Sequence, residues 1–181
     1  SRGLGDVYKR QAPVLSRIAA YEPQTVDIDG LAYREGLNVV WLEAGVATNT
    51  LPDEAVLRVN FRFAPNRSAD EAMAHFREVL GLDEFAPEDL TVDVEDVSPG
   101  ALPGLHAAAA KELVAVAGDV VKPKFGWTDV ARFSALGIPA VNFGPGDPAY
   151  CHKKDEQIPV ECITALWEDV RRYLTTAPVA E

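Results

Sequence analysis

One histidine stands in a polar loop near the end of the chain, in the stretch PAYCHKKDEQIP at residues 148–159. Histidine, the type of residue 152, is the commonest metal ligand in proteins and the usual acid or base near neutral pH. One imidazole alone, however, binds a metal weakly. Two interpretations therefore stay open: a metal ligand whose partners lie elsewhere, or a solvated loop histidine. The adjacent Cys151 is predicted to be a small packing residue and not a ligand.

The remaining histidines and cysteines do not supply the missing partners. His75 and His106 are predicted to be solvated, and neither belongs to an HxxxH or HxD pair. Cys151 and Cys162 lie eleven residues apart, which indicates neither a disulfide framework nor a zinc knuckle. The sequence also contains no GxSxG motif, P-loop or Rossmann glycine fingerprint. These patterns alone assign no reaction.

Two further groups of residues could bind an anion. A helix predicted to begin near Thr128 or Asp129 has unpaired N–H groups at its start, which could hold a carboxylate; the two residues could also merely cap the helix. In the stretch EAVLRVNFRF, Asn60 and Arg62 share the polar face of a strand whose other face is apolar. They could reach over a cleft or face water.

The elements that position these residues fall into two groups, and the first group alternates helices with strands. It contains a helix that ends at Pro23 and strands at residues 38–44, 54–63 and 90–97. Between the second and third strands, Ser68 and Glu71 form a capping box for a helix that Gly81 ends. The resulting order is a split βαββαβ unit without its first strand.

The turn-rich stretch SPGALPG at residues 98–104 is the predicted domain boundary. The chain then follows an α/β pattern, with helices ending at Gly118 and Gly137, a buried strand at 138–143 and a last helix from Pro159. That helix is expected to bury one apolar stripe, formed by Ile163, Leu166, Trp167, Val170 and Leu174. Residues 1–11 show neither the helical nor the strand period and are interpreted as a cloning or assembly remnant. The predicted domains are therefore residues 12–98 and 99–181.

The composition excludes several classes of partner. The 181 residues are 48% hydrophobic and carry a net charge of -11, so the chain can bury a core but lacks the basic face that nucleic acids and anionic membranes require. No apolar run approaches the length of a membrane span, and no signal peptide opens the sequence. We predict a cytoplasmic protein with reduced cysteines.

Two motifs in the expected order resemble one family. VATNTLPDEAVLRVNFRFAP, followed by FGWTDVARFSALGIPAVNFGPGDPAYCHKKDE, is similar to sequences of the dizinc aminoacylase and carboxypeptidase superfamily, and the likeness runs from about residue 12 to 174. The resemblance implies an α/β enzyme in which a partial ferredoxin-like dimerisation lid precedes part of a zinc-dependent catalytic domain. It also implies a homodimer through the lid and a small anionic N-acyl amino-acid substrate.

The same resemblance implies roles for individual residues. The last zinc ligand falls on His152, with two zinc ions per subunit in the intact enzyme and cobalt as a possible substitute. The implied substrate-binding residues are Asn49 and Arg62 in the lid and Gly126, Thr128, Asp129 and Asp147 in the second domain. Asp147 stands where relatives often carry asparagine, and together with Trp127 this departs from the family pattern.

Other residues of the family pattern do not occur in this sequence. They are the histidine and aspartate of an HxD motif, the glutamate pair with the general base, a further acidic ligand and a lid histidine. We therefore expect the chain to be the carboxyl-terminal part of a linear-amide hydrolase, with no catalytic residue of its own. The alternatives are a related deacetylase or carboxypeptidase, or a non-catalytic dimerisation or binding module.

Overall fold

The computed structural model describes residues 7–118 and 120–176. The chain divides into two compact units between Gly100 and Ala101, and each is described by itself. The roles predicted for residues 12–98 and 99–181 stay predictions. No helix in the described ranges is long and apolar enough to cross a membrane.

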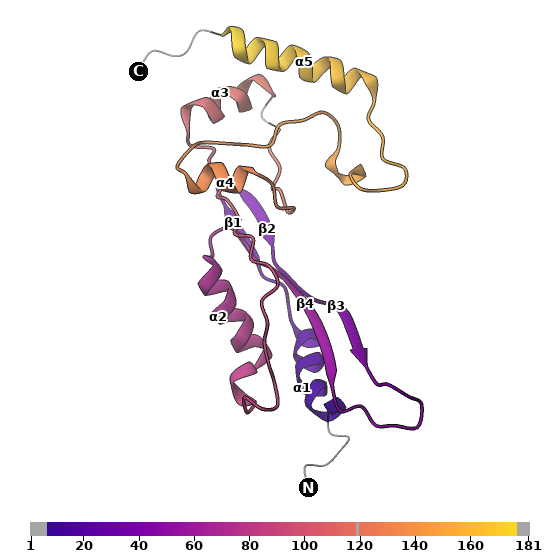
Figure 1. The fold of residues 1–181 in the computed structure, drawn as a ribbon. Helices are drawn as coiled ribbons and strands as arrows, with labels where there is room; N and C mark the ends of the chain where they lie inside the picture. The colour runs from indigo at the N-terminus through magenta and orange to yellow at the C-terminus, as the bar shows by residue number, and fades with distance from the viewer. Residues whose placement is uncertain (1–6, 119, 177–181) are drawn as a thin grey trace. The chain divides into compact units, whose positions relative to one another are not determined.

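The first unit combines two helices with two antiparallel hairpins (Figure 1). Its elements are α1 (Val7–Ala20), β1 (Thr25–Ile28), β2 (Leu31–Arg34), β3 (Gly36–Ala44), β4 (Ala55–Arg62), α2 (Ala69–Leu80) and the 3-10 turn η1 (Leu82–Glu84). The mixed helix and strand content confirms the predicted class. The strands predicted at 38–44 and 54–63 are confirmed as β3 and β4.

The core of this unit lies between the β3–β4 hairpin and the helices. Val14, Leu37, Leu80 and Leu82 form its buried centre, and Leu57, Val59 and Phe61 of β4 pack against them. Along β4 these three residues alternate with Arg58, Asn60 and Arg62. One face of the hairpin is therefore covered, and the other faces outward.

Helix α2 has the ends that the sequence predicts. The Ser68 hydroxyl accepts a hydrogen bond from the Glu71 backbone, and the Glu71 carboxylate accepts one from the Ser68 backbone. The bonds that the Glu71 carboxylate accepts from the Ser68 backbone and, secondly, from the Ser68 hydroxyl lower the pKa of Glu71. Gly81 closes the helix with a φ of 60°, a left-handed conformation that glycine adopts without steric cost.

Two features of the first unit were missed in the sequence. Residues 25–34 form the β1–β2 hairpin, whose Asp29-Gly30 turn has positive φ at both residues, as a tight hairpin turn requires. Helix α1 begins at Val7 with Pro13 inside it, so residues 7–11, in which the sequence shows no helical period, are helical. An ion pair of 2.6 Å between Arg10 and Asp89 holds these first turns against the rest of the unit.

The strand predicted at residues 90–97 is absent from the first unit as described. This segment has no ladder hydrogen bonds, and its valines are exposed, Val94 by 54%. An ion pair of 3.2 Å between the Arg58 and Glu95 side chains joins the segment to β4. In a split βαβ unit, the strands before and after the second helix flank a central strand, and that strand is the one the sequence pattern lacks. Residues 90–97 therefore have no backbone partner here.

The second unit contains α3 (Ala108–Val116), α4 (Val130–Ala135), the 3-10 turn η2 (Pro148–Tyr150) and α5 (Val160–Thr175), with no strand among its described residues. The prediction of a buried strand at 138–143 is wrong, since Ile138 is 47% exposed and the segment is irregular. The predicted buried stripe of α5 is wrong as well: Trp167 is 64% exposed and Leu174 73%. Both segments have the expected apolar pattern, but among the described residues the helix α3 packs against α5 without covering its stripe, and no strand pairs with 138–143.

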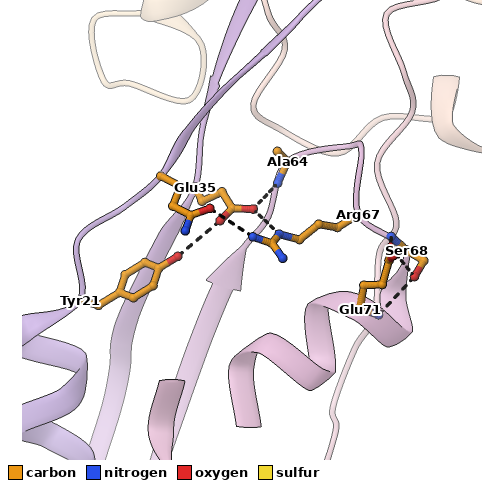
Figure 2. Close-up of polar contacts among 7 residues, drawn as sticks. Tyr21, Glu35, Ala64, Arg67, Ser68 and Glu71 are labelled. Atoms are coloured by element: carbon orange, nitrogen blue, oxygen red, sulfur yellow. Dashed lines mark hydrogen bonds and ion pairs between the residues drawn. The ribbon is translucent and has the colours of Figure 1, made fainter. Parts of the chain in front are cut away.

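A buried carboxylate joins three parts of the first unit (Figure 2). One oxygen of Glu35 accepts hydrogen bonds from the Ala64 backbone at 3.1 Å and from Arg67 Nε at 2.9 Å, while the other accepts one from the Tyr21 hydroxyl at 3.4 Å. Glu35 is 3% exposed, so almost no water competes for these bonds. Burial, and secondly the Glu35 charge, raise the pKa of Tyr21.

Replacing Glu35 with alanine is expected to lower the free energy of unfolding by about 2–3 kcal/mol, because Arg67 and the Ala64 N–H would lose their acceptor in a buried site. Glu84→Ala is the control. It removes the ion pair between Arg17 and a Glu84 side chain that is 66% exposed, and it should cost under about 1 kcal/mol. Urea unfolding of both variants tests this. Equal losses would show that the Glu35 network contributes no more than a surface pair.

Candidate functional site

The loop that carries His152 is shaped by backbone contacts. Asp147 accepts a hydrogen bond from the Ala149 backbone at 2.9 Å and so caps η2. His152 is exposed and has a φ of 63°, a left-handed conformation that is uncommon outside glycine. Its backbone N–H donates to the Glu156 carboxylate at 3.2 Å. The chain thus turns sharply at His152, which is the one predicted metal ligand.

The residues before α4 form a second part of the predicted site. The Thr128 hydroxyl accepts a hydrogen bond from the Asn142 amide at 3.1 Å, which ties the start of α4 to the segment 138–143. Asp129 occupies the N-cap position, but its side chain makes no capping bond, and α4 has only six residues. The helix dipole therefore offers little to a carboxylate here. Gly126 and Asp129 are exposed, so both are available to a ligand.

The described residues do not by themselves make a metal centre. No group of three or more His, Cys, Asp or Glu in ranges 7–118 and 120–176 could hold an ion. His106 is exposed, as predicted. The prediction for His75 is wrong: its Nε2 is buried, and its ring lies 5.8 Å from that of Phe61 and 6.3 Å from that of Tyr21. The helical period placed His75 on the solvent side, but the aromatic cluster on β4 extends over it.

The two predicted lid residues lie at opposite ends of β4. Asn49 is exposed in the loop that joins β3 to β4. Arg62 is the last residue of β4, and it is exposed on the same face of the strand as Asn60. At about 3.3 Å per residue, the strand from Ala55 to Arg62 is about 23 Å long. The length of β4 thus separates Arg62 from the end of the strand that the Asn49 loop joins.

Comparison with known proteins indicates the family of the chain. Residues 12–84 match the family model of the peptidase dimerisation domain. A succinyl-diaminopimelate desuccinylase of Corynebacterium glutamicum is 51% identical over 174 residues, which cover 95% of this chain and 47% of the relative. The chain belongs to the peptidase family that carries this dimerisation domain.

More distant relatives have related activities. A succinyl-diaminopimelate desuccinylase of Novosphingobium aromaticivorans is 30% identical, over 78% of this chain and 37% of the relative. An N-acetyl-L-citrulline deacetylase of Xanthomonas campestris is 29% identical, over 76% of this chain and 38% of the relative. The chain thus spans about half the length, or less, of the curated relatives it matches.

Proposed function

We propose that this chain is part of an amide hydrolase that converts N-succinyl-LL-2,6-diaminopimelate and water to succinate and LL-2,6-diaminopimelate, a step in lysine and diaminopimelate biosynthesis. The identity of 51% over 95% of the chain with a desuccinylase carries the proposal. In this reading, residues 12–98 are the dimerisation lid and residues 99–181 belong to the catalytic domain. A cytoplasmic location fits such a biosynthetic role.

Arg62 is proposed to bind a carboxylate of the substrate. Its guanidinium can donate two parallel hydrogen bonds to one carboxylate, and the exposed face of β4 leaves it accessible. A local positive charge matters because the chain carries a net charge of -11 and would otherwise repel an anionic substrate.

Gly126, Thr128, Asp129 and Asp147 of the second unit are further proposed substrate-binding residues. Asn49 lies in the loop at the other end of β4 from Arg62 and is proposed to serve the site of the other copy in a homodimer. The match to a dimerisation domain supports the homodimer.

The proposed metal is zinc, two ions per subunit, with cobalt as a possible substitute and His152 as one ligand. The described residues offer no group of ligands around His152, which supports the proposal that the remaining ligands come from outside residues 7–118 and 120–176.

Substrate preference tests the proposal. The matching 174 residues of the Corynebacterium glutamicum relative would be replaced by those of this chain, and hydrolysis of N-succinyl-LL-2,6-diaminopimelate would be compared with that of N-acetyl amino acids and dipeptides. We expect the succinyl substrate to have the highest kcat/KM. A preference for an acetyl substrate would favour the deacetylase alternative, and one for dipeptides the carboxypeptidase alternative.

The 181-residue chain alone is expected to release no succinate from this substrate and to bind zinc no more tightly than a surface histidine does, because one imidazole holds an ion weakly. Amine release and zinc titration by calorimetry measure the two properties. Hydrolysis that a chelator abolishes would contradict the proposal that the catalytic centre needs residues outside this chain.

A further inference from the structure

Glu35 is the residue at which the chain passes from one hairpin of the first unit to the other. It lies between the last residue of β2, Arg34, and the first residue of β3, Gly36. Its backbone N–H donates to the Gln24 carbonyl at 2.8 Å, and its side chain is buried. Both the main chain and the side chain of Glu35 are therefore held in place.

The carboxylate of Glu35 accepts a backbone bond just beyond the point where the pairing of β3 with β4 stops. Gly36 opposite Arg62 is the last pair of this ladder, and two residues further the Ala64 N–H donates to Glu35 Oε1 at 3.1 Å (Figure 2). Ala64 is 2% exposed, so its N–H has almost no access to water as another acceptor. The Glu35 side chain thus anchors the chain as it leaves β4.

The same oxygen of Glu35 holds the segment that leads into α2. Arg67 Nε donates to Oε1 at 2.9 Å, and Arg67 directly precedes Ser68, the N-cap of α2. The turn between is closed by a bond of 3.1 Å from the Arg67 backbone N–H to the Ala64 carbonyl. Residues 64–67 are therefore tied at both ends to one acceptor, which sets where the chain leaves β4.

Arg62 depends on this anchor because it ends its strand. The residue opposite, Gly36, has no side chain that could pack against that of Arg62. The Arg62 side chain is exposed, so the position of its guanidinium follows the backbone at the end of β4. Two residues further, Glu35 holds that backbone. A misplacement of about 1 Å can lower a rate about 100-fold.

We propose that Glu35 is a positioning residue, which fixes the end of β4 through residues 64–67 and so holds Arg62 in place for a substrate carboxylate. The inference rests on the proposed function of Arg62. It requires the position of one Glu35 oxygen rather than the charge, because the bonds from the Ala64 backbone and from Arg67 Nε both go to Oε1.

Two substitutions separate the position of this oxygen from the charge. Glu35→Gln keeps an oxygen for both bonds, and its amide can donate to the Tyr21 hydroxyl, which lies 3.4 Å from the other carboxylate oxygen. We expect a lower Tm, because the ion pair with Arg67 is lost, but a kcat/KM within about twofold of that of the unsubstituted enzyme. Glu35→Asp keeps the charge on a shorter side chain and should lower kcat/KM about tenfold or more.

Steady-state kinetics of a double-mutant cycle in the chimera show whether Glu35 acts through Arg62. The cycle combines Glu35→Asp with Arg62→Ala and uses the acyl substrate that the chimera prefers, so the identity of the acyl group does not affect it. Once Arg62 is replaced, Glu35→Asp should lower kcat/KM less than about twofold further. Glu84→Asp shortens the carboxylate of a surface ion pair in the same unit and, as the control, should leave kcat/KM unchanged.

Three results would overturn the role of Glu35 alone: normal kcat/KM in Glu35→Asp beside a loss in Arg62→Ala, an equal loss from Glu35→Asp with and without Arg62, or a loss in Glu35→Gln as large as in Glu35→Asp. Normal kcat/KM in Arg62→Ala would instead overturn the substrate role of Arg62, and the role of Glu35 with it. Circular dichroism and Tm show which variants are folded at the assay temperature, and Glu35→Gln decides by itself if Glu35→Asp is not.

Discussion

Replacing His152 with glycine in a full-length enzyme that carries this sequence is expected to remove one zinc per subunit and to lower kcat about 1,000-fold or more. A bound metal contributes several kcal/mol of transition-state stabilisation, and a lost ligand opens its coordination sphere. Metal content by mass spectrometry and steady-state kinetics on the succinyl substrate measure the two effects. The chimera with the Corynebacterium glutamicum relative provides such an enzyme.

Glycine is the informative substitution because of the backbone at this position. The φ of His152 is 63°, which glycine adopts freely and alanine does not. His152→Gly thus removes the imidazole without straining the turn, whereas His152→Ala adds a backbone cost. Lys154→Ala, two residues further in the same exposed loop, is the control and should leave metal and turnover unchanged. Two zinc ions per subunit with near-normal turnover in His152→Gly would return His152 to a solvated loop residue.

Replacing Arg62 with either lysine or alanine is expected to lower kcat/KM about thirtyfold or more, which corresponds to about 2–4 kcal/mol for a lost charge-assisted contact in a desolvated site. Lysine keeps the charge but cannot copy the planar fork that donates two parallel bonds to a carboxylate. Stability should hardly change, because Arg62 is exposed and its neighbour Phe61 makes the core contacts. Kinetics and Tm are measured on the same samples.

Arg34 offers a matched control, since it also ends a strand of the first unit and is exposed. Arg34→Ala lowers the positive charge equally, so an equal loss of kcat/KM would indicate a general electrostatic effect. Normal kcat/KM in Arg62→Lys alone would exclude bidentate binding. Normal values in both Arg62 variants would place this residue on a solvated face, the alternative that the strand pattern leaves open.

Local signals predicted the elements whose stability is local. The Ser68–Glu71 capping box and the Gly81 stop define α2 by bonds within a few residues, and the alternation of residues 54–63 defines β4 because one face packs on the helices. Local signals likewise predicted that His152 lies in a loop and that Arg62 lies on the outward face of its strand. The β1–β2 hairpin had a signal too, the Asp29-Gly30 pair, but its strands of four residues are too short for a clear period.

Long-range partners decided what the patterns could not. Residues 90–97 and 138–143 have the composition of strands, yet a strand forms only when another strand accepts its backbone bonds, and none does in the described chain. The apolar stripe of α5 likewise predicts burial but does not say what buries it. Periodicity describes a face, and burial depends on what the rest of the fold brings to that face.

The sequence by itself determined α2, β3 and β4 of the first unit and indicated its family, whereas the site residues that it predicts stay predictions. The tertiary structure alone showed that Glu35 is a buried acceptor for Arg67, a contact between residues 32 positions apart that no local pattern contains. It also showed that Asn49 and Arg62 lie at opposite ends of β4, although both belong to one continuous motif. The physical reason is that a motif records which residues are present, whereas strand length and register set the distance between them.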